Sequence, residues 1–166
     1  MCVSYLLIKN ILVLKIKSSK LFLKLKRDIK QYQTIVSSNE ALSDKENNSL
    51  MNIISKYNLE NFNEIMSLEF KGCDAEIDDK ELEDFKLSID HYFSLYAPED
   101  EEFKEFIKLI SLYLTYIAKK PLHPPGIIFS NGSKVYQSKD SFVCTGKNIF
   151  IRDELSLCRY CIARDP

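Results

Sequence analysis

The chain has 166 residues, 45% apolar and 28% charged, which suits one soluble globular domain with room for a small appendage. Its formal net charge of -1 argues against a general nucleic-acid binder, because neutralising phosphates requires a clear basic excess. The average conceals a net charge of +7 over residues 1–30 and of -12 over residues 60–105. The simpler interpretation is that the basic and the acidic stretch each form a solvated surface of the folded protein. A basic N-terminal arm for RNA or an anionic lipid surface is the alternative.

The opening stretch, MCVSYLLIKNILVLKIKSSKLFLKLK, does not have the form of a targeting or membrane segment. No positive charge precedes its apolar run and no small-residue cleavage site follows, so a secretory signal is not expected. Lys9 and Lys15 interrupt the run well before the roughly 20 apolar residues of a membrane span. We expect residues 1–17 to form an N-terminal extension or a helix, and the protein to be cytoplasmic.

Residues 18–120 are predicted to form a helical body. The basic stretch 18–36 can form one helix capped by Ser18 or Ser19. Ser43-x-x-Glu46 has the form of a capping box and predicts a helix over 44–57. A further apolar stripe over 59–70 is followed by Gly72, the expected C-terminal cap.

Two more helices complete this body. The first should begin after Asp78 and stop before Pro98, since the residue ahead of a proline avoids the helical region. Its expected inner face is Leu82, Phe85, Ile89 and Phe93. Pro98 is expected at the first position of the next helix, whose segment FIKLISLYLTYIA is apolar on nearly every side. That helix should therefore run through the centre of the bundle.

The character of the chain changes after residue 120. Asn131-Gly132 predicts a hairpin turn between residues 127–129 and 134–136, and Ser138-Lys139-Asp140 predicts a second turn leading to residues 142–144. The predicted fold class is α+β and mostly α: a bundle of about four to six helices, followed by a small β-hairpin, metal-ribbon-like module over residues 121–166.

Ligand-type residues gather in this module. An odd number of cysteines, five, argues against a disulfide framework in a cytosolic chain. Two of them form a C-x2-C pair, and two residues between cysteines let both sulfurs turn toward one ion. The predicted metal ligands are Cys144, Cys158, Cys161 and His123, with Cys73 in reserve for His123, and with Cys2 not involved.

Zinc is the expected metal, because a segment of about 45 residues with two hairpins is expected to lack a core of its own. A tetrahedral site of three cysteines and one histidine would supply folding energy to such a segment. Lys147, Arg152, Arg159 and Arg164 are close enough in sequence to offset its net negative charge. An iron–sulfur cluster, a thiol redox role and unliganded thiols remain open alternatives.

Other chemistry has little support in the residues. There is no glycine-rich phosphate loop, no G-x-S-x-G and no H-E-x-x-H. His91 has Asp90 beside it, but neighbours on a helix point apart, so His91 is expected to be an ordinary surface or core residue. A zinc enzyme would need an acid or base from nearby carboxylates such as Asp140, Asp153 or Glu154.

The stretch YAPEDEEFKEFIKLISLYLTYIAKKPLHPPGIIF, followed by VYQSKDSFVCTGK and LSLCRYCIA, resembles an uncharacterised family of methanogenic archaea, domain of unknown function 2115 or uncharacterised protein family 0305. The matching parts are LHPPG at 122–126, the lone Cys144 and the terminal C-x2-C. Where prolines are expected in relatives, this sequence has Thr145, Arg159 and Ile162. The resemblance implies a cytoplasmic archaeal protein and supplies no activity.

We therefore favour a non-enzymatic interaction protein over an enzyme. It is expected to have a zinc-stabilised C-terminal module and an unknown protein partner. Neither a nucleic-acid partner nor a membrane span is expected. The alternatives are an iron–sulfur or thiol redox protein, a zinc-dependent enzyme, and a basic-arm RNA or lipid binder.

Overall fold

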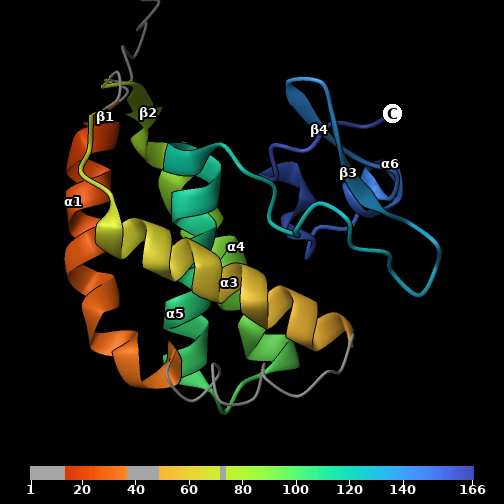
Figure 1. The fold of residues 1–166 in the computed structure, drawn as a ribbon, viewed down its shortest axis with the longest axis horizontal. Coiled ribbons are helices and arrows are strands. Elements are labelled where there is room, and N and C mark those ends of the chain that lie inside the picture. Colours follow the sequence, from red (N-terminus) through yellow and green to blue (C-terminus); the bar gives the residue numbers. More distant parts are fainter. Residues whose placement is uncertain (1–13, 37–48, 72–73) are drawn as a thin grey trace, which may run out of the picture.

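A computed structural model describes residues 14–36, 49–71 and 74–166. Four longer helices form one body, and a small module with a β-hairpin lies beside it (Figure 1). None of the helices in these ranges is long and apolar enough to cross a membrane. In chain order the elements are β1 (Lys15–Lys17), α1 (Ser18–Ile29), a 3-10 turn (Lys30–Tyr32), α3 (Leu50–Ser67), β2 (Glu76–Asp78), α4 (Asp79–Tyr96), α5 (Glu101–Leu112), a π-helical segment (Tyr113–Ala118), β3 (Val135–Ser138), β4 (Ser141–Cys144), α6 (Lys147–Phe150) and a 3-10 turn (Leu157–Arg159).

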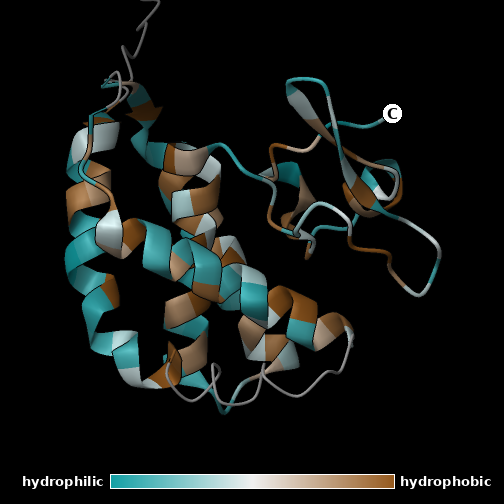
Figure 2. Ribbon diagram, in the orientation of Figure 1, coloured by the Kyte–Doolittle hydropathy of each residue, from teal (hydrophilic) through white to brown (hydrophobic). Residues whose placement is uncertain are grey.

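Helix α5 is the centre of the body, as its apolar sequence predicts. It contacts α1, α3 and α4, and its continuation from 111 to 116 is buried at every position. Figure 2 shows hydrophilic positions on the outer sides of α1 and α3, so the apolar residues of these helices face α5. Burial of aromatic and branched side chains around one helix supplies most of the stability of such a body.

Helix α4 agrees with the sequence in detail. The carboxylate of Asp78 accepts a hydrogen bond from the main-chain N–H of Glu81 at 3.0 Å, which caps the first turn. The four predicted inner-face residues are the buried ones, and the helix ends at Tyr96, before Pro98. Local capping and apolar spacing are therefore sufficient to define this helix.

The start of α1 is capped from a distant part of the chain, and not by Ser18 or Ser19 as predicted. The carboxylate of Asp74 accepts a hydrogen bond from the N–H of Ser19 at 2.9 Å, and this bond holds the pKa of Asp74 below its usual range. Strands β1 and β2 pair antiparallel and bring the two segments together. The single helix predicted over 18–36 is interrupted by the 3-10 turn at Lys30–Tyr32, and residues 33–36 are helical again.

Helix α3 corrects two further boundaries. It is one continuous helix, whereas the sequence predicted a helix over 44–57 and a separate apolar stripe over 59–70. Its N-cap is Ser49, whose hydroxyl oxygen accepts a hydrogen bond from the main-chain N–H of Asn52 at 3.3 Å. The predicted capping box lies outside the described residues. The helix ends at Ser67, not at Gly72, because Leu68 is extended.

The start of α5 is also later than predicted. Pro98 and Glu99 form a turn, and the helix begins at Glu101 with Asp100 as its N-cap. The carboxylate of Asp100 accepts from the N–H of Phe103 at 2.9 Å. A side-chain cap inside the acidic run therefore determines where the helix begins, in place of the proline.

The C-terminal module contains both predicted turns. Gly132 has a left-handed φ of 81° at the first turn, where Ile128 and Lys134 form a single bridge, and Lys139 lies in the second, between β3 and β4. The α+β, mostly α fold is thus confirmed. Within this segment Ile127 and Ala163 are fully buried and Val135 nearly so, while Leu122, Leu157 and Tyr160 pack against the core of the helical body.

The capping role of Asp78 in α4 can be tested directly. Substituting Asp78→Ala leaves the Glu81 N–H without its acceptor and should lower the free energy of unfolding by about 1 kcal/mol. Asp79→Ala, one residue further, removes a carboxylate that does not cap the helix and should cost clearly less. Urea unfolding followed by circular dichroism measures both. Equal losses for the two variants would contradict the cap.

Candidate metal centre

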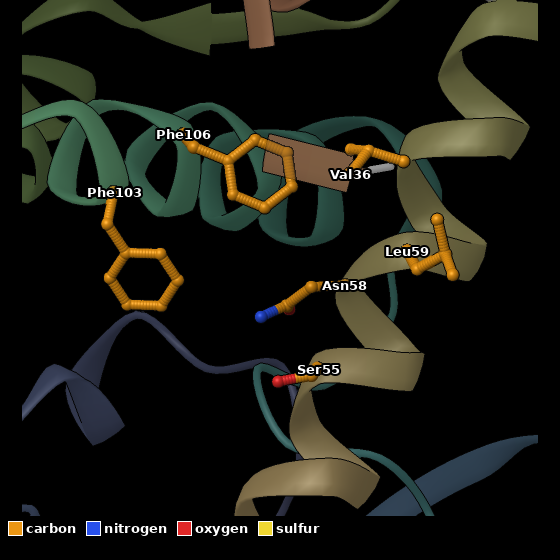
Figure 3. Close-up of a pocket in the computed structure, with 6 residues that line it drawn as sticks. All are labelled: Val36, Ser55, Asn58, Leu59, Phe103 and Phe106. Carbon is orange, nitrogen blue, oxygen red and sulfur yellow. The ribbon is translucent and has the colours of Figure 1, made fainter. Parts of the chain in front are cut away.

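The helical body offers no room for a substrate at the gap drawn in Figure 3. This gap lies between α3 and α5, where Ser55 and Asn58 face the ring of Phe103. Its volume of about 10 Å³ corresponds to a single water molecule. The predicted metal ligands lie elsewhere, in the C-terminal module.

Among the predicted ligands, Cys161 has main-chain N–H groups and a lysine ammonium close to its sulfur. Its sulfur accepts a hydrogen bond from the N–H of Leu122 at 3.4 Å, and the N–H of Ala163 also faces it. Burial raises the pKa of the Cys161 thiol above its usual value, while these N–H groups and the ammonium of Lys147 act in the opposite direction. Hydrogen bonds and a nearby cation favour the thiolate, which is the form that binds metal.

Lys147 holds the segment that follows the C-x2-C pair. Its ammonium donates to the carbonyl oxygens of Cys161 and Ala163, both at 2.6 Å. These two bonds fix the last residues of the chain against α6 and place a positive charge close to the Cys161 sulfur. The sequence indicated only a general compensating charge for Lys147, because no local pattern shows which carbonyls a lysine reaches.

Cys158 and Cys144 are positioned by main-chain contacts. Cys158 lies in the 3-10 turn capped by Ser156, and its carbonyl accepts from the N–H of Cys161 at 3.3 Å. Cys144 ends β4, and its N–H donates to the carbonyl of Arg164 at 2.8 Å. Both cysteines therefore adjoin the segment 161–164, one through the turn and one through a strand-like pairing.

His123 follows Leu122, whose N–H reaches the Cys161 sulfur. Its ring packs edge-on against Phe129, with centroids 5.0 Å apart. Burial lowers the pKa of His123 below its usual value, so the imidazole is neutral at pH 7, the form in which histidine binds metals.

The four segments converge, but their side chains do not form a set of ligands in this geometry. Within residues 14–36, 49–71 and 74–166, no group of three or more His, Cys, Asp or Glu side chains is arranged to hold a metal ion. Cys144, Cys158 and Cys161 are free thiols, each partly buried. Cys73, the reserve ligand, and Cys2 lie outside the described residues. The zinc site remains a prediction.

The residue before Cys161 connects the module to the helical body. The Tyr160 ring stacks on Phe85 of α4 with centroids 4.3 Å apart, and its hydroxyl lies 3.1 Å from that of Ser88. A second connection comes from Tyr57 of α3, whose hydroxyl donates to the Pro121 carbonyl at 2.9 Å. Neither tyrosine was predicted from the sequence. The contact partners of Tyr160 and Tyr57 lie 75 and 64 residues away in the sequence, so no local signal could have indicated them.

The fold thus defines a class, a helical body with a cysteine-bearing hairpin module. The chain belongs to the family described as an uncharacterized protein conserved in archaea (DUF2115), whose model matches residues 9–166. No solved structure shows significant similarity.

Three relatives in methanogens illustrate the extent of the similarity. A UPF0305 protein of Methanocaldococcus jannaschii is 30% identical over 158 residues, which are 89% of this chain and 96% of that protein. One of Methanothermobacter thermautotrophicus is 31% identical over 52% of this chain and 54% of that protein. One of Methanococcus maripaludis is 30% identical over 55% and 56%, respectively.

The raised pKa of Cys161 predicts its reactivity. In metal-free protein at pH 8, Cys161 should react with iodoacetamide more slowly than an exposed thiol, because less of it is thiolate, and its rate should rise steeply with pH. Lys147→Gln removes the nearby ammonium and should slow the reaction further. Peptide mass spectrometry measures each rate. Cys161 labelling as fast as a free cysteine, with or without Lys147, would count against this environment.

Substitutions of Tyr160 separate its two contacts. Tyr160→Phe keeps the stack on Phe85 and loses only the hydroxyl contact with Ser88, so it should cost about 1 kcal/mol or less. Tyr160→Ala loses the stack as well and should cost about 2–3 kcal/mol. Urea unfolding gives both values. A Tyr160→Ala variant as stable as Tyr160→Phe would show that the stack does not hold the module.

Proposed function

We propose that the protein is a non-enzymatic, cytoplasmic interaction protein whose C-terminal module binds one structural zinc ion through Cys144, Cys158, Cys161 and His123. The observation that carries this proposal is the convergence of three segments on residues 161–164. The N–H of Leu122 reaches the Cys161 sulfur, and the N–H of Cys144 reaches the Arg164 carbonyl. Residues far apart in sequence are thereby brought into one small module.

The electrostatics support thiolate ligands at this place. Metal binding must displace the proton that burial keeps on Cys161, and the two N–H groups and Lys147 lower the cost of that step. His123 already has the neutral form. The ligands do not yet surround one point, so binding requires the cysteine side chains to rotate toward the ion.

A structural role fits better than a catalytic one. A catalytic zinc keeps an open position and needs a general acid or base within reach of it. Asp140, Asp153 and Glu154 are all exposed on the surface, so none of them lies in an enclosed site next to the cysteines. In the interaction role that we propose, the zinc-stabilised module on the helical body presents a rigid surface to a protein partner.

Metal content of protein purified without oxygen tests the proposal. We expect about one zinc per chain and a chelator-induced loss of about 3 kcal/mol, or about 10 °C in melting temperature. Cys158→Ser and Cys161→Ser should lose the metal, whereas the matched variant Cys2→Ser should keep it. His123→Ala should also lose it if the site is closed.

Other outcomes have definite meanings. Iron in the purified protein, together with a visible absorbance band, would indicate an iron–sulfur cluster in place of zinc. Metal-free protein whose melting temperature does not respond to a chelator or to added zinc would refute the proposal. Zinc retained in His123→Ala would indicate an open site and favour enzymatic chemistry.

A further inference from the structure

A groove of about 390 Å³ separates α4 from the segment that leads into the C-x2-C pair. Its volume lies within the range of about 300–1,000 Å³ that small-molecule sites occupy. One wall is one side of α4, because Leu87 and Ser88 lie four and three residues before His91, the spacings that share a helix face. The lining residues are Leu87, Ser88 and His91 on that wall, and Glu154, Leu155 and Arg159 opposite.

Arg159 is a cation without a carboxylate partner in the described ranges. Its guanidinium donates to the main-chain carbonyl of Glu154 and lies over the Tyr160 ring at 5.5 Å, but no acidic side chain there forms an ion pair with it. One donor to one carbonyl leaves most of its five N–H groups available. Arg159 can therefore bind a carboxylate in the bidentate manner typical of arginine.

The other polar groups of the groove differ in their availability. The Ser88 hydroxyl is already engaged, since it donates to the Asp84 carbonyl at 2.8 Å and contacts the Tyr160 hydroxyl. The Glu154 carboxylate and the His91 imidazole have no hydrogen-bond or ion-pair partner among the described residues. Two opposite charges thus line one groove without neutralising each other.

Apolar surface accompanies these charges. Leu87 is 64% exposed although it belongs to the helix that carries the core, and Leu155 lies opposite it. A ligand that covers both leucines removes this surface from water. A simple anion would face Glu154 and a simple cation would face Arg159, so neither matches the groove as a whole.

We propose that this groove binds a small molecule that carries one carboxylate and one ammonium on an apolar body, the chemistry of an apolar α-amino acid. Arg159 receives the carboxylate, Glu154 receives the ammonium, and the apolar side chain lies between Leu87 and Leu155. This site goes beyond the structural zinc and does not require the metal. It makes the surface between body and module a ligand-responsive one.

Three matched probes test the ligand class by titration of ¹⁵N-labelled full-length protein, observed by NMR. L-leucine should shift the amide signals of the lining residues in a saturable way, with a dissociation constant on the order of 1 mM or tighter. 4-Methylpentanoate lacks the ammonium and 3-methylbutylamine lacks the carboxylate. Each should bind at least about tenfold more weakly than leucine.

Variants assign the two charges. Arg159→Gln and Glu154→Gln should each weaken leucine binding by about tenfold or more, while Arg152→Gln, an exposed arginine outside the groove, should leave it unchanged. Melting temperatures confirm that each variant is folded. Absence of saturable shifts with leucine would overturn the site. So would equal binding of leucine and 4-methylpentanoate, or an equal loss in Arg152→Gln.

The two proposals fail separately. If protein without zinc binds leucine, the result contradicts the zinc proposal and supports the groove proposal. If protein that contains zinc shows no response to leucine, the result supports the zinc proposal and contradicts the groove proposal. Measuring the zinc content of each NMR sample therefore distinguishes the outcomes.

Discussion

The stacking of Tyr160 on Phe85 is the contact through which the C-x2-C pair is attached to the helical body. Tyr160 lies between the cysteines of the C-x2-C pair, and Phe85 is a fully buried residue of the capped helix α4. One stacked pair thus connects the predicted metal ligands to the core of the helical body. The neighbouring Arg159 is directed by the same turn to the groove beside α4. Metal chemistry and ligand binding, as proposed, would both depend on this attachment.

Burial and hydrogen bonding have opposite effects on the pKa of Cys161. An apolar environment favours the protonated thiol, whereas the N–H groups of Leu122 and Ala163 and the ammonium of Lys147 favour the thiolate. A thiol in this balance reacts more slowly than an exposed one while it keeps its proton, and a bound divalent cation would displace that proton. The same donors that would hold the thiolate also fix the chain end against α6.

Much of the fold could be predicted from local patterns. Asp78 and the apolar spacing after it define α4, and Asn131-Gly132 defines a hairpin turn, because each acts on residues within one or two turns of itself. The predicted start of α1 was wrong because a distant residue, Asp74, caps it, whereas the predicted start of α5 was wrong because one local cap, Asp100, prevails over another local signal, Pro98. The candidate site divides in the same way: C-x2-C is visible in the sequence, whereas the donors to the Cys161 sulfur are not.

The helical body, the central position of α5 and the hairpin turns follow from the amino-acid order, because period, capping and turn chemistry are properties of short segments. The resemblance to the family rests on the LHPPG element and the C-x2-C pair, which are also visible in the sequence. The folded arrangement was needed to show which residues adjoin Cys161, how Tyr160 attaches the module, and which charges in the groove lack partners among the described residues. Two of the contacts that define these features join residues 39 positions apart, Leu122 with Cys161, and 75 positions apart, Phe85 with Tyr160. No spacing rule encodes such contacts, since they arise only when the body and the module bury surface against each other.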